Sequence, residues 1–435
     1  MYKKVPVVKL PQVEAAQLAG LPLEASVELA DLAGAVKDGL LGFCADVGLM
    51  VMAQMLDAEM TARVGPKHAK IPGRTANWHG DTDGPVVLGG RKLTVTRPRG
   101  RTVEGAEVEL DSWRVFSSTD LLSQLTVERM LAGIATRRHA AIGEPVGETI
   151  DAKGKATGRS SVSRRFKAAT ETALVELMAR DLSDLEVAVI MIDGLDVAGQ
   201  MVVVALVITA DGTKVPVGLW LGDTENKVVV TALLADLAAR GLSAQKGVMA
   251  VLDGAKALTA GVKKVLGENT PIQRCTLHKR RNVKGYLPKD LGKKIDWRLA
   301  RAFAHTDAVQ GLAQAKKIAA ELKADHPDAA ASLLEGLEEM FTVRRLGVTG
   351  PLARTLTNTN CIESMISIAR TTMRNVKRWR DGEMKKRWVA VGMLEAERSF
   401  RRVRGAADMP ALVAAVHRHV TGESVTPTNY DESAA

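Results

Sequence analysis

The most constraining feature of this chain is the order of its apolar runs between Glu186 and Leu287. A strand-like run at 187–192 is followed by two more, at 201–208 and 215–220, which flank Asp211-Gly212, a strong hairpin signal. Next come a helical pattern at 228–239, a strand at 248–252, a helix near 257–266, a short strand at 272–275 and another helix. The order β-β-β-α-β-α-β-α predicts an α/β domain.

This order is that of the ribonuclease-H-like fold. In that fold the first and fourth strands are parallel neighbours, so their carboxyl ends lie side by side. Asp193 ends the first run and Asp253 ends the fourth. Because ligand sites of open α/β sheets lie at the carboxyl ends of strands, we expect these two carboxylates to be adjacent.

A third carboxylate, Glu363, opens a later helical pattern, and the polar run 357–360 just before it supplies an N-cap, which places Glu363 in the first turn. An apolar stripe on this helix is expected to pack on the sheet; it comprises Ile362, Ile366, Ala369, Met373 and Val376. Convergent carboxylates can bind magnesium. Asp193, Asp253 and Glu363 are therefore the candidate catalytic and metal-binding residues for phosphodiester chemistry.

Basic side chains follow Glu363 along the same helix. Arg370, Arg374 and Lys377 project within about 40° of it on a helical wheel, where they can hold nucleic-acid phosphates. A solvated helix face with spaced charges is the alternative. Arg378 extends the basic run, and Trp379 is a candidate for stacking on a base or sugar.

The long separation between Asp253 and Glu363 predicts an insertion. The intervening chain is helical after Leu287 and rich in Ala, Leu, Lys and Glu, until Gly347 to Pro351 breaks the pattern. A minimal fold of this type needs fewer residues, so we infer an inserted all-helical subdomain of roughly 50 residues.

Charge favours a polyanionic partner. The net charge is +10 and the pI is about 9.5, which fits nucleic acid best, although ribosome-binding and membrane-surface proteins share this bias. A basic, β-rich stretch at 65–101 adds Arg74, Arg97 and Arg99 as candidate DNA contacts. Serines before Arg164 and Arg165 suggest the start of a helix-turn-helix recognition helix, or else an ordinary capped surface helix.

Cys275 and His278 have the spacing of half a zinc site, but no further ligand pair is evident unless His417 and His419 contribute. Packing or hydrogen bonding near the sheet, or contact of His278 and Arg280 with DNA, is favoured over zinc. The three cysteines are scattered, as in proteins of a reducing compartment. No apolar run is long enough to span a membrane and no signal sequence is seen, so we expect a cytoplasmic protein.

These patterns divide the chain into predicted parts. The expected boundaries are a loosely ordered N-terminus at 1–30, a helical and basic β module at 31–115, a helical DNA-binding module at 116–185, the catalytic domain at 186–290 and 351–405, its helical insertion at 291–350, and a C-terminal helix and tail at 406–435.

An ordered series of short motifs is similar to the Mutator-type transposases of bacterial insertion sequences. It comprises Glu59-Met60-Thr61 through Gly65, Gly73-Arg74-Thr75, Asp193, Gly218 to Gly222 with Glu225, Leu252-Asp253-Gly254, Cys275 to His278, and Thr359 to Ser364. The resemblance spans roughly 40–404, and such a series is more specific than any single motif.

The resemblance implies a ribonuclease-H-like domain, interrupted by a helical insertion, with an Asp-Asp-Glu triad that binds two magnesium ions, for which manganese can substitute. Asp193, Asp253 and Glu363 would be that triad, with Asp196 as a close competitor for the first position. The expected activity is strand cleavage and strand transfer on the terminal inverted repeats of a mobile element and on target DNA. The expected form is a nucleoid-associated homodimer or higher oligomer in a bacterium.

Two other functions remain open. One is a ribonuclease-H-like nuclease or resolvase without strand transfer, and the other is a non-catalytic DNA-binding regulator. The regulator predicts loss of a carboxylate, yet Asp193, Asp253 and Glu363 are all present.

Overall fold

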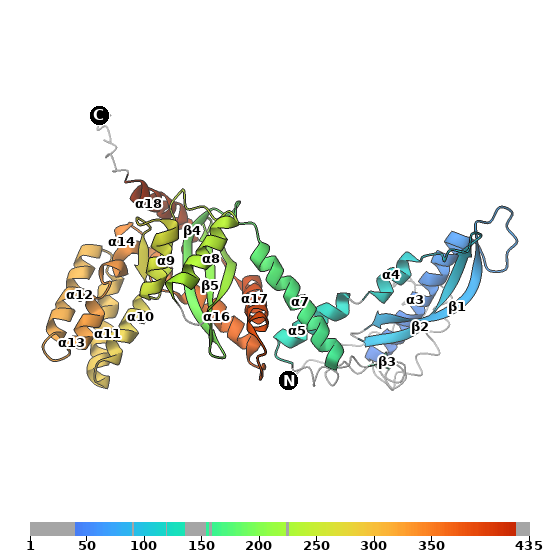
Figure 1. Cartoon of the computed structure of the whole chain (residues 1–435), viewed down its shortest axis with the longest axis horizontal. Helices are drawn as coiled ribbons and strands as arrows, with labels where there is room; N and C mark the ends of the chain where they lie inside the picture. Colours follow the sequence, from blue (N-terminus) through green and yellow to red (C-terminus); the bar gives the residue numbers. More distant parts are fainter. Residues whose placement is uncertain are drawn as a thin grey trace, which may run out of the picture. The chain divides into compact units, whose positions relative to one another are not determined.

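The structure is a computed structural model that describes residues 40–88, 91–118, 120–134, 154–155, 159–222 and 226–422. It divides into two units, Met1–Ala169 and Thr170–Ala435, and each is described by itself (Figure 1). Three predictions lie outside the described residues: the loose N-terminus, the motif position at Glu225 and the end of the tail. None of the described helices is long and apolar enough to cross a membrane.

The first unit combines helices with a small antiparallel sheet. Its elements are α3 (Leu40–Val64), β1 (Ala76–Leu88), β2 (Arg91–Thr102), α4 (Asp111–Ser117), α5 (Asp120–Leu131) and β3 (Gly154–Lys155), with the strand order β1-β2-β3. Leu56 and Met60 of α3 are fully buried and pack in one cluster with Ala76 and Leu110. The strand-like pieces predicted in the basic stretch therefore belong to a long hairpin, β1 and β2, that shares a core with α3.

Helix α7 (Arg159–Ala179) begins earlier than the sequence predicted. Ser160, Ser161 and Ser163 lie within its first turns and do not precede it. The predicted serine N-cap is therefore wrong. Serine is tolerated inside a helix at little cost, so its preference for caps does not by itself locate a helix start.

The second unit contains a mixed five-stranded sheet. Its strands are β4 (Val187–Val197), β5 (Gln200–Thr209), β6 (Lys214–Gly222), β7 (Met249–Leu252) and β8 (Ile272–Arg274), in the order β6-β5-β4-β7-β8. β4, β5 and β6 pair antiparallel, whereas β7 pairs parallel with both β4 and β8. The predicted hairpin and the predicted parallel neighbours, the first and fourth strands, are both confirmed.

Helices cover this sheet. α8 (Lys227–Ala239) and α9 (Lys256–Leu266) share a buried cluster with the side chains of Ile190 and Ile192 on β4. α16 (Asn360–Met373) and α18 (Met409–Thr421) contact β4, and α17 (Gly382–Ser399) contacts both β6 and α16. The apolar stripe predicted on α16 is buried from Ile362 to Met373, and Val376 lies beyond the end of the helix.

A second hydrophobic core lies among the helices between β8 and α16. These helices are α10 (Thr276–Gly285), α11 (Lys289–Ala304), α12 (Ala308–Leu322), α13 (Pro327–Leu334), a 3-10 helix (Glu338–Phe341), α14 (Thr342–Arg345) and α15 (Gly350–Leu356). Leu299, Ile318, Leu333 and Phe341 share one buried cluster, which also includes Val283 of α10. The chain is therefore helical where helices were predicted. The break predicted at 347–351 is short because α15 already begins at Gly350, with Pro351 in its first turn.

Candidate active site

Asp193 and Asp253 are neighbours because of the register of the parallel strands. Ile192 of β4 pairs with Leu252 of β7, the last pair in the register, and each aspartate directly follows its member of this pair. The strand end predicted at Asp193 is wrong, since β4 continues to Val197. It continues because the antiparallel partner β5 extends past the end of β7 and keeps hydrogen bonding to β4.

The pleat of β4 separates Asp193 from Asp196. Side chains alternate along a strand, so Asp193 projects opposite to Ile190 and Ile192, which pack toward α8 and α9. Asp196, three positions on, projects to the face opposite Asp193 and is exposed near the hairpin turn. Asp193 therefore faces the side of the sheet that α16 contacts.

The turn after β7 fixes the Asp253 carboxylate. Its Oδ1 accepts a hydrogen bond from the N–H of Ala255 at 2.8 Å. Between them Gly254 has φ of +111°, a region that residues with a Cβ rarely adopt. The chain thus turns sharply while its aspartate stays anchored.

Glu363 lies in the first turn of α16, as predicted. Its Oε1 accepts a hydrogen bond from the hydroxyl of Thr359 at 2.8 Å. Thr359, within the predicted polar run, is the N-cap residue, although its own side chain makes no capping bond. The N–H of Asn360 donates instead to the side-chain Oδ1 of Asn358 at 3.0 Å, so the polar run does supply a capping acceptor, as predicted.

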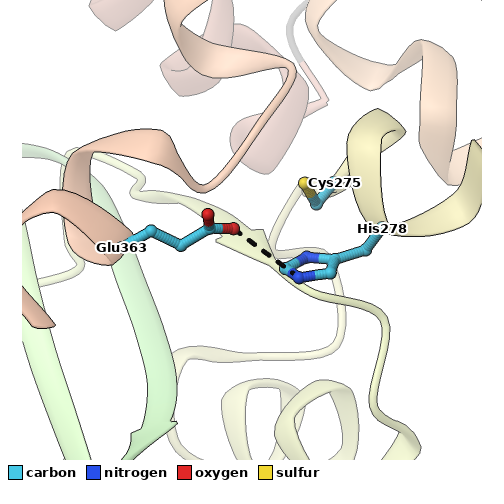
Figure 2. Close-up of side chains that lie close together, drawn as sticks. All are labelled: Cys275, His278 and Glu363. Carbon is cyan, nitrogen blue, oxygen red and sulfur yellow. Dashed lines mark ion pairs between the residues drawn. The ribbon is translucent and has the colours of Figure 1, made fainter. Parts of the chain in front are cut away.

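Cys275 and His278 lie beside Glu363 (Figure 2). One ligand atom from each of the three residues falls within 4.8 Å of the others, and the Nε2 of His278 is 3.6 Å from the Oε1 of Glu363. Thr359 joins this group, since its Oγ1 lies 3.3 Å from the Sγ of Cys275. Among the described residues the group has three members and does not include His417, whose Nδ1 faces the carbonyl of Lys246.

A backbone link brings these two segments together. The carbonyl of Thr357, just before α16, accepts hydrogen bonds from both the N–H and the hydroxyl of Thr276 at the start of α10, each at 3.0 Å. Cys275 and His278 are thereby held against the first turn of α16. The spacing of Cys275 and His278 in the sequence therefore matches a contact with α16.

The pKa values report how these charges act on one another. The pKa of Asp193 is raised to about 6, mainly by burial and also by the charges of Asp253 and Glu363, while a hydrogen bond from the N–H of Gly194 and the charge of His278 oppose the rise. Asp253 and Glu363 therefore act on Asp193 as like charges, and His278 is the cationic group that opposes them.

His278 and Cys275 also influence each other. Their mutual hydrogen bond is the largest cause that raises the pKa of His278, against its burial and together with the charges of Glu363 and Asp253. Burial alone would raise the pKa of the Cys275 thiol, but hydrogen bonds with His278 and Thr359 outweigh it and lower that pKa. The histidine is thus biased toward the protonated form next to the acids.

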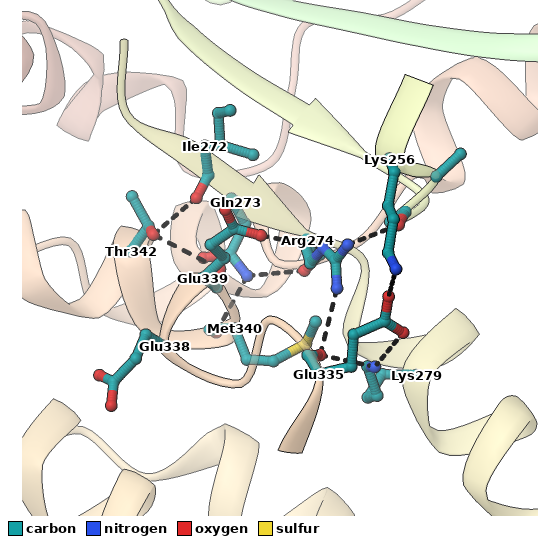
Figure 3. Close-up of polar contacts among 12 residues, drawn as sticks. Lys256, Ile272, Gln273, Arg274, Lys279, Glu335, Glu338, Glu339, Met340 and Thr342 are labelled. Atoms are coloured by element: carbon teal, nitrogen blue, oxygen red, sulfur yellow. Dashed lines mark hydrogen bonds and ion pairs between the residues drawn. The ribbon is translucent and has the colours of Figure 1, made fainter. Parts of the chain in front are cut away.

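A buried arginine connects the turn after β7 to the helical core (Figure 3). The guanidinium of Arg274 on β8 donates to the carbonyl of Gly254 at 2.6 Å and to the carbonyl of Glu335 at 3.1 Å, and its Nε lies 2.9 Å from a carboxylate oxygen of Glu339. Arg274 is 4% exposed. The residue after Asp253 is therefore held by a cation that also contacts the end of α13.

Two polar side chains complete this link. The amide of Gln273 donates to the carbonyl of Met340 and accepts from the N–H of Val343, both at 2.9 Å. The hydroxyl of Thr342 donates to the carbonyl of Ile272 at 2.7 Å. The edge strand β8, which lies next to β7, is thus paired on its free side with the helical segment (Figure 3).

The basic row predicted on the Glu363 helix is only partly helical. Arg370 is exposed in the last turn of α16, Arg374 is the C-cap, and Lys377, Arg378 and Trp379 follow the helix. The expectation of one continuous wheel to Lys377 is therefore wrong. The hydroxyls of Thr371 and Thr372 bond to carbonyls of the preceding turn, which weakens a helix near its end.

Other predicted DNA contacts have partners within the protein. Arg280 makes a two-pronged ion pair with Asp296, at 2.9 and 2.8 Å. Arg97 and Arg99 both bond to Glu107, and Arg74 donates to the carbonyls of Val64, Pro66 and Ala69. These three bonds of Arg74 hold the turn after α3 in place. Arg164 is exposed and Arg165 is half-buried on α7.

Sequence reasoning missed Thr359 and Arg274 as parts of the site. Thr359 precedes Glu363 by four positions, the spacing at which side chains of one helix face meet, and this signal was available. Arg274 had no such signal, because its partners Gly254 and Glu335 are distant in sequence.

The fold and these residues define a protein with a carboxylate-rich candidate site on an α/β sheet. The sequence model of the family described as Transposase, Mutator family, matches residues 23–402. The chain belongs to the Mutator family of transposases.

Two relatives agree with this membership. The chain is 30% identical over 169 residues to the transposase for insertion sequence element IS6120 of Mycolicibacterium smegmatis, which covers 38% of this chain and 51% of the relative. It is 26% identical over 217 residues to a probable insertion-sequence transposase of Corynebacterium diphtheriae, covering 49% of this chain and 62% of the relative. The matches thus span about half to three fifths of these relatives.

Proposed function

We propose that this protein is a DNA transposase of the Asp-Asp-Glu type, which cuts DNA at the ends of a mobile element and joins those ends to target DNA. The observation that carries the proposal is the pairing of Ile192 with Leu252, which sets Asp193 beside Asp253 within electrostatic reach of Glu363. Family membership supplies the reaction class.

The architecture supports a ribonuclease-H-like catalytic domain. Its three antiparallel strands followed by two parallel ones have the order expected for that fold. The separate core of the helices between β8 and α16 supports a helical insertion before the last catalytic helix.

The three carboxylates fit a divalent cation. They supply hard oxygen ligands, and the pKa of Asp193 is raised by burial and by the neighbouring charges of Asp253 and Glu363, both of which a bound cation would offset. When bound, a pair of Mg²⁺ ions, or Mn²⁺ in their place, supplies Lewis-acid activation of the attacking oxygen and charge stabilisation of the leaving oxygen. Asp193, Asp253 and Glu363 would be their ligands.

The protein's own groups would orient these ligands. Thr359 holds one oxygen of Glu363, and the Ala255 N–H holds one oxygen of Asp253, so each keeps a second oxygen for the cation. Exposed cations beyond α16, such as Lys377 and Arg378, can contact the phosphates of double-stranded DNA. Joining two element ends to one target implies at least a dimer.

The test is incubation of the purified protein with Mg²⁺ and DNA that carries the element ends. Asp193→Asn and Glu363→Gln should each reduce strand cleavage by about 100-fold or more, a loss of several kcal/mol of transition-state stabilisation. Asp196→Asn is the matched control, on the same strand but the opposite face, and should cleave like the parent.

Three outcomes separate the alternatives. Cleavage followed by joining supports the transposase, and cleavage without joining supports a nuclease or resolvase. DNA binding without either supports a regulator. If Asp193→Asn and Glu363→Gln cut and join as well as the parent, the triad assignment is wrong.

A further inference from the structure

A basic pocket lies beside the catalytic helix α16. It has a volume of about 640 Å³ and is bordered by α15, the start of α16, the start of β6 and the segment after α17. Its cationic lining residues are Lys214, Arg354, Arg401, Arg402 and Arg404. None of these residues was assigned a function above.

The charges of the basic pocket are largely uncompensated. No carboxylate lines it. Arg402 is paired with Asp211 at 2.9 Å, an exposed contact that solvent screens. Within the described part of the chain, Arg354, Arg401 and Arg404 have no ion-pair partner. By contrast, the pocket near α9 is lined by acids as well as by cations; its acids are Glu268, Glu335 and Glu339.

The backbone around the pocket is firmly held. The hydroxyl of Thr355 donates to the carbonyl of Arg404 at 3.3 Å, and the side chain of Asn358 donates to the carbonyl of Arg354 at 2.6 Å. Gly405 has φ of +82°, and a Cβ there would lie 2.5 Å from the backbone nitrogen of Leu352. The two segments therefore meet backbone to backbone, while the guanidinium groups of Arg354, Arg401 and Arg404 remain exposed.

The pocket shares the first turn of α16 with Glu363. Asn360, Cys361 and Ser364 line it and form one face of that turn, and Glu363 lies next to this face. A group in the pocket therefore lies against the same turn of α16 that carries Glu363.

We propose that this pocket binds the phosphodiester backbone of the DNA strand being processed, close to the reacting bond. Arginines present planar sets of N–H donors that match phosphate oxygens, and the N-terminal end of α16 adds favourable dipole charge. The pocket would fix the position of the strand relative to Glu363. This inference rests on the proposed DNA-processing function. Free inorganic phosphate offers the same chemistry and is separated from DNA by the test.

The test is the salt dependence of binding to a short DNA duplex of arbitrary sequence, with the full chain. Each phosphate contact contributes about 0.9 to the slope of log K against log salt concentration. We expect Arg401→Ala/Arg404→Ala to lower this slope by about one to two and to weaken binding about 10-fold or more at low salt. Arg401→Lys/Arg404→Lys should keep most of the slope.

A charge-matched control removes two exposed lysines elsewhere in the second unit, Lys294→Ala/Lys323→Ala, and should change the slope less. Thermal unfolding shows that each variant is folded. If the arginine-to-alanine variant binds with the parent's slope and affinity, the pocket does not contact DNA. If inorganic phosphate raises the parent's Tm but not the variant's while DNA affinity is unchanged, the pocket binds free phosphate and the DNA assignment is overturned.

These outcomes are independent of the proposed reaction. If the parent binds DNA through the pocket but cleaves nothing with Mg²⁺, the catalytic proposal fails and the pocket assignment stands. If the parent cleaves and joins DNA but the arginine variants bind as it does, only the pocket assignment fails.

Discussion

Asp193 is a half-buried carboxylate whose pKa is raised by burial and by the charges of Asp253 and Glu363. Its pKa of about 6, compared with 3.8 ordinarily, means that the folded state binds this proton more tightly than the unfolded chain does. Without metal, the free energy of unfolding therefore falls as the pH rises from about 4 to about 6, and it stays lower above that range.

Asp193→Asn should remove this penalty. We expect a gain in the free energy of unfolding of about 1–3 kcal/mol at pH 7 to 8, which shrinks as the pH falls through 6 and vanishes near 4. The measurement is urea unfolding in chelator across this pH range, with Asp196→Asn as the control that shows no gain. A gain of equal size at every pH would contradict the assigned pKa.

Thr359 positions Glu363 through one hydrogen bond. Thr359→Val keeps the shape of this fully buried side chain and removes the donor, so we expect cleavage to slow by about 10- to 100-fold while the affinity for DNA is kept. Thr359→Ser restores the hydroxyl and should recover most of the rate. Equal losses of DNA binding and cleavage, with no rescue by serine, would show that Thr359 acts only in packing.

At the scale of the elements, α16 and α17 pack closely against each other at Gly392. A Cβ at Gly392 would lie 2.6 Å from the Cα of Ala369, so the two helices touch where α16 supports the site. Gly392→Ala should lower the free energy of unfolding by about 1–3 kcal/mol through overpacking. Since the backbone of α16 must shift, the rate of cleavage should fall as well.

The matched control for this change is Gly285→Ala at the end of α10, where a new Cβ would meet no atom within 4 Å. Chemical denaturation of both variants measures the difference. We expect Gly285→Ala to be neutral or slightly stabilising, since alanine favours the helix. Similar destabilisation of both variants would show that close helix contact is not the cause.

The elements were predictable where local pattern decides structure. The hairpin at Asp211-Gly212 and the amphipathic α16 follow from turn chemistry and apolar spacing, and both are present. Element ends were less predictable. β4 extends past Asp193 because β5 lies beside it, and α16 stops before Lys377, so each end depends on neighbours or on local side-chain competition.

For the whole molecule, the proposed function predicts that a divalent cation binds to Asp193, Asp253 and Glu363. Mg²⁺ should raise the Tm of the parent, since a ligand at 100 times its Kd stabilises the folded state by about 2.7 kcal/mol. Asp193→Asn and Asp253→Asn should lose most of this shift. Chelation should abolish cleavage and leave duplex binding nearly unchanged, as gel-shift and cleavage assays on one sample would show. An equal Tm shift in the parent and both variants would place the cation elsewhere.

The sequence by itself determined the identity of the three acids, the strand order that makes two of them neighbours, and the basic character of the chain. Those depend on local periodicity and on residue type, which a single chain displays. The tertiary structure decided which groups surround the acids: Thr359 and His278 at Glu363, Arg274 at the turn after Asp253, and the basic pocket beside α16. These contacts join residues far apart in the chain, and only packing brings such residues together.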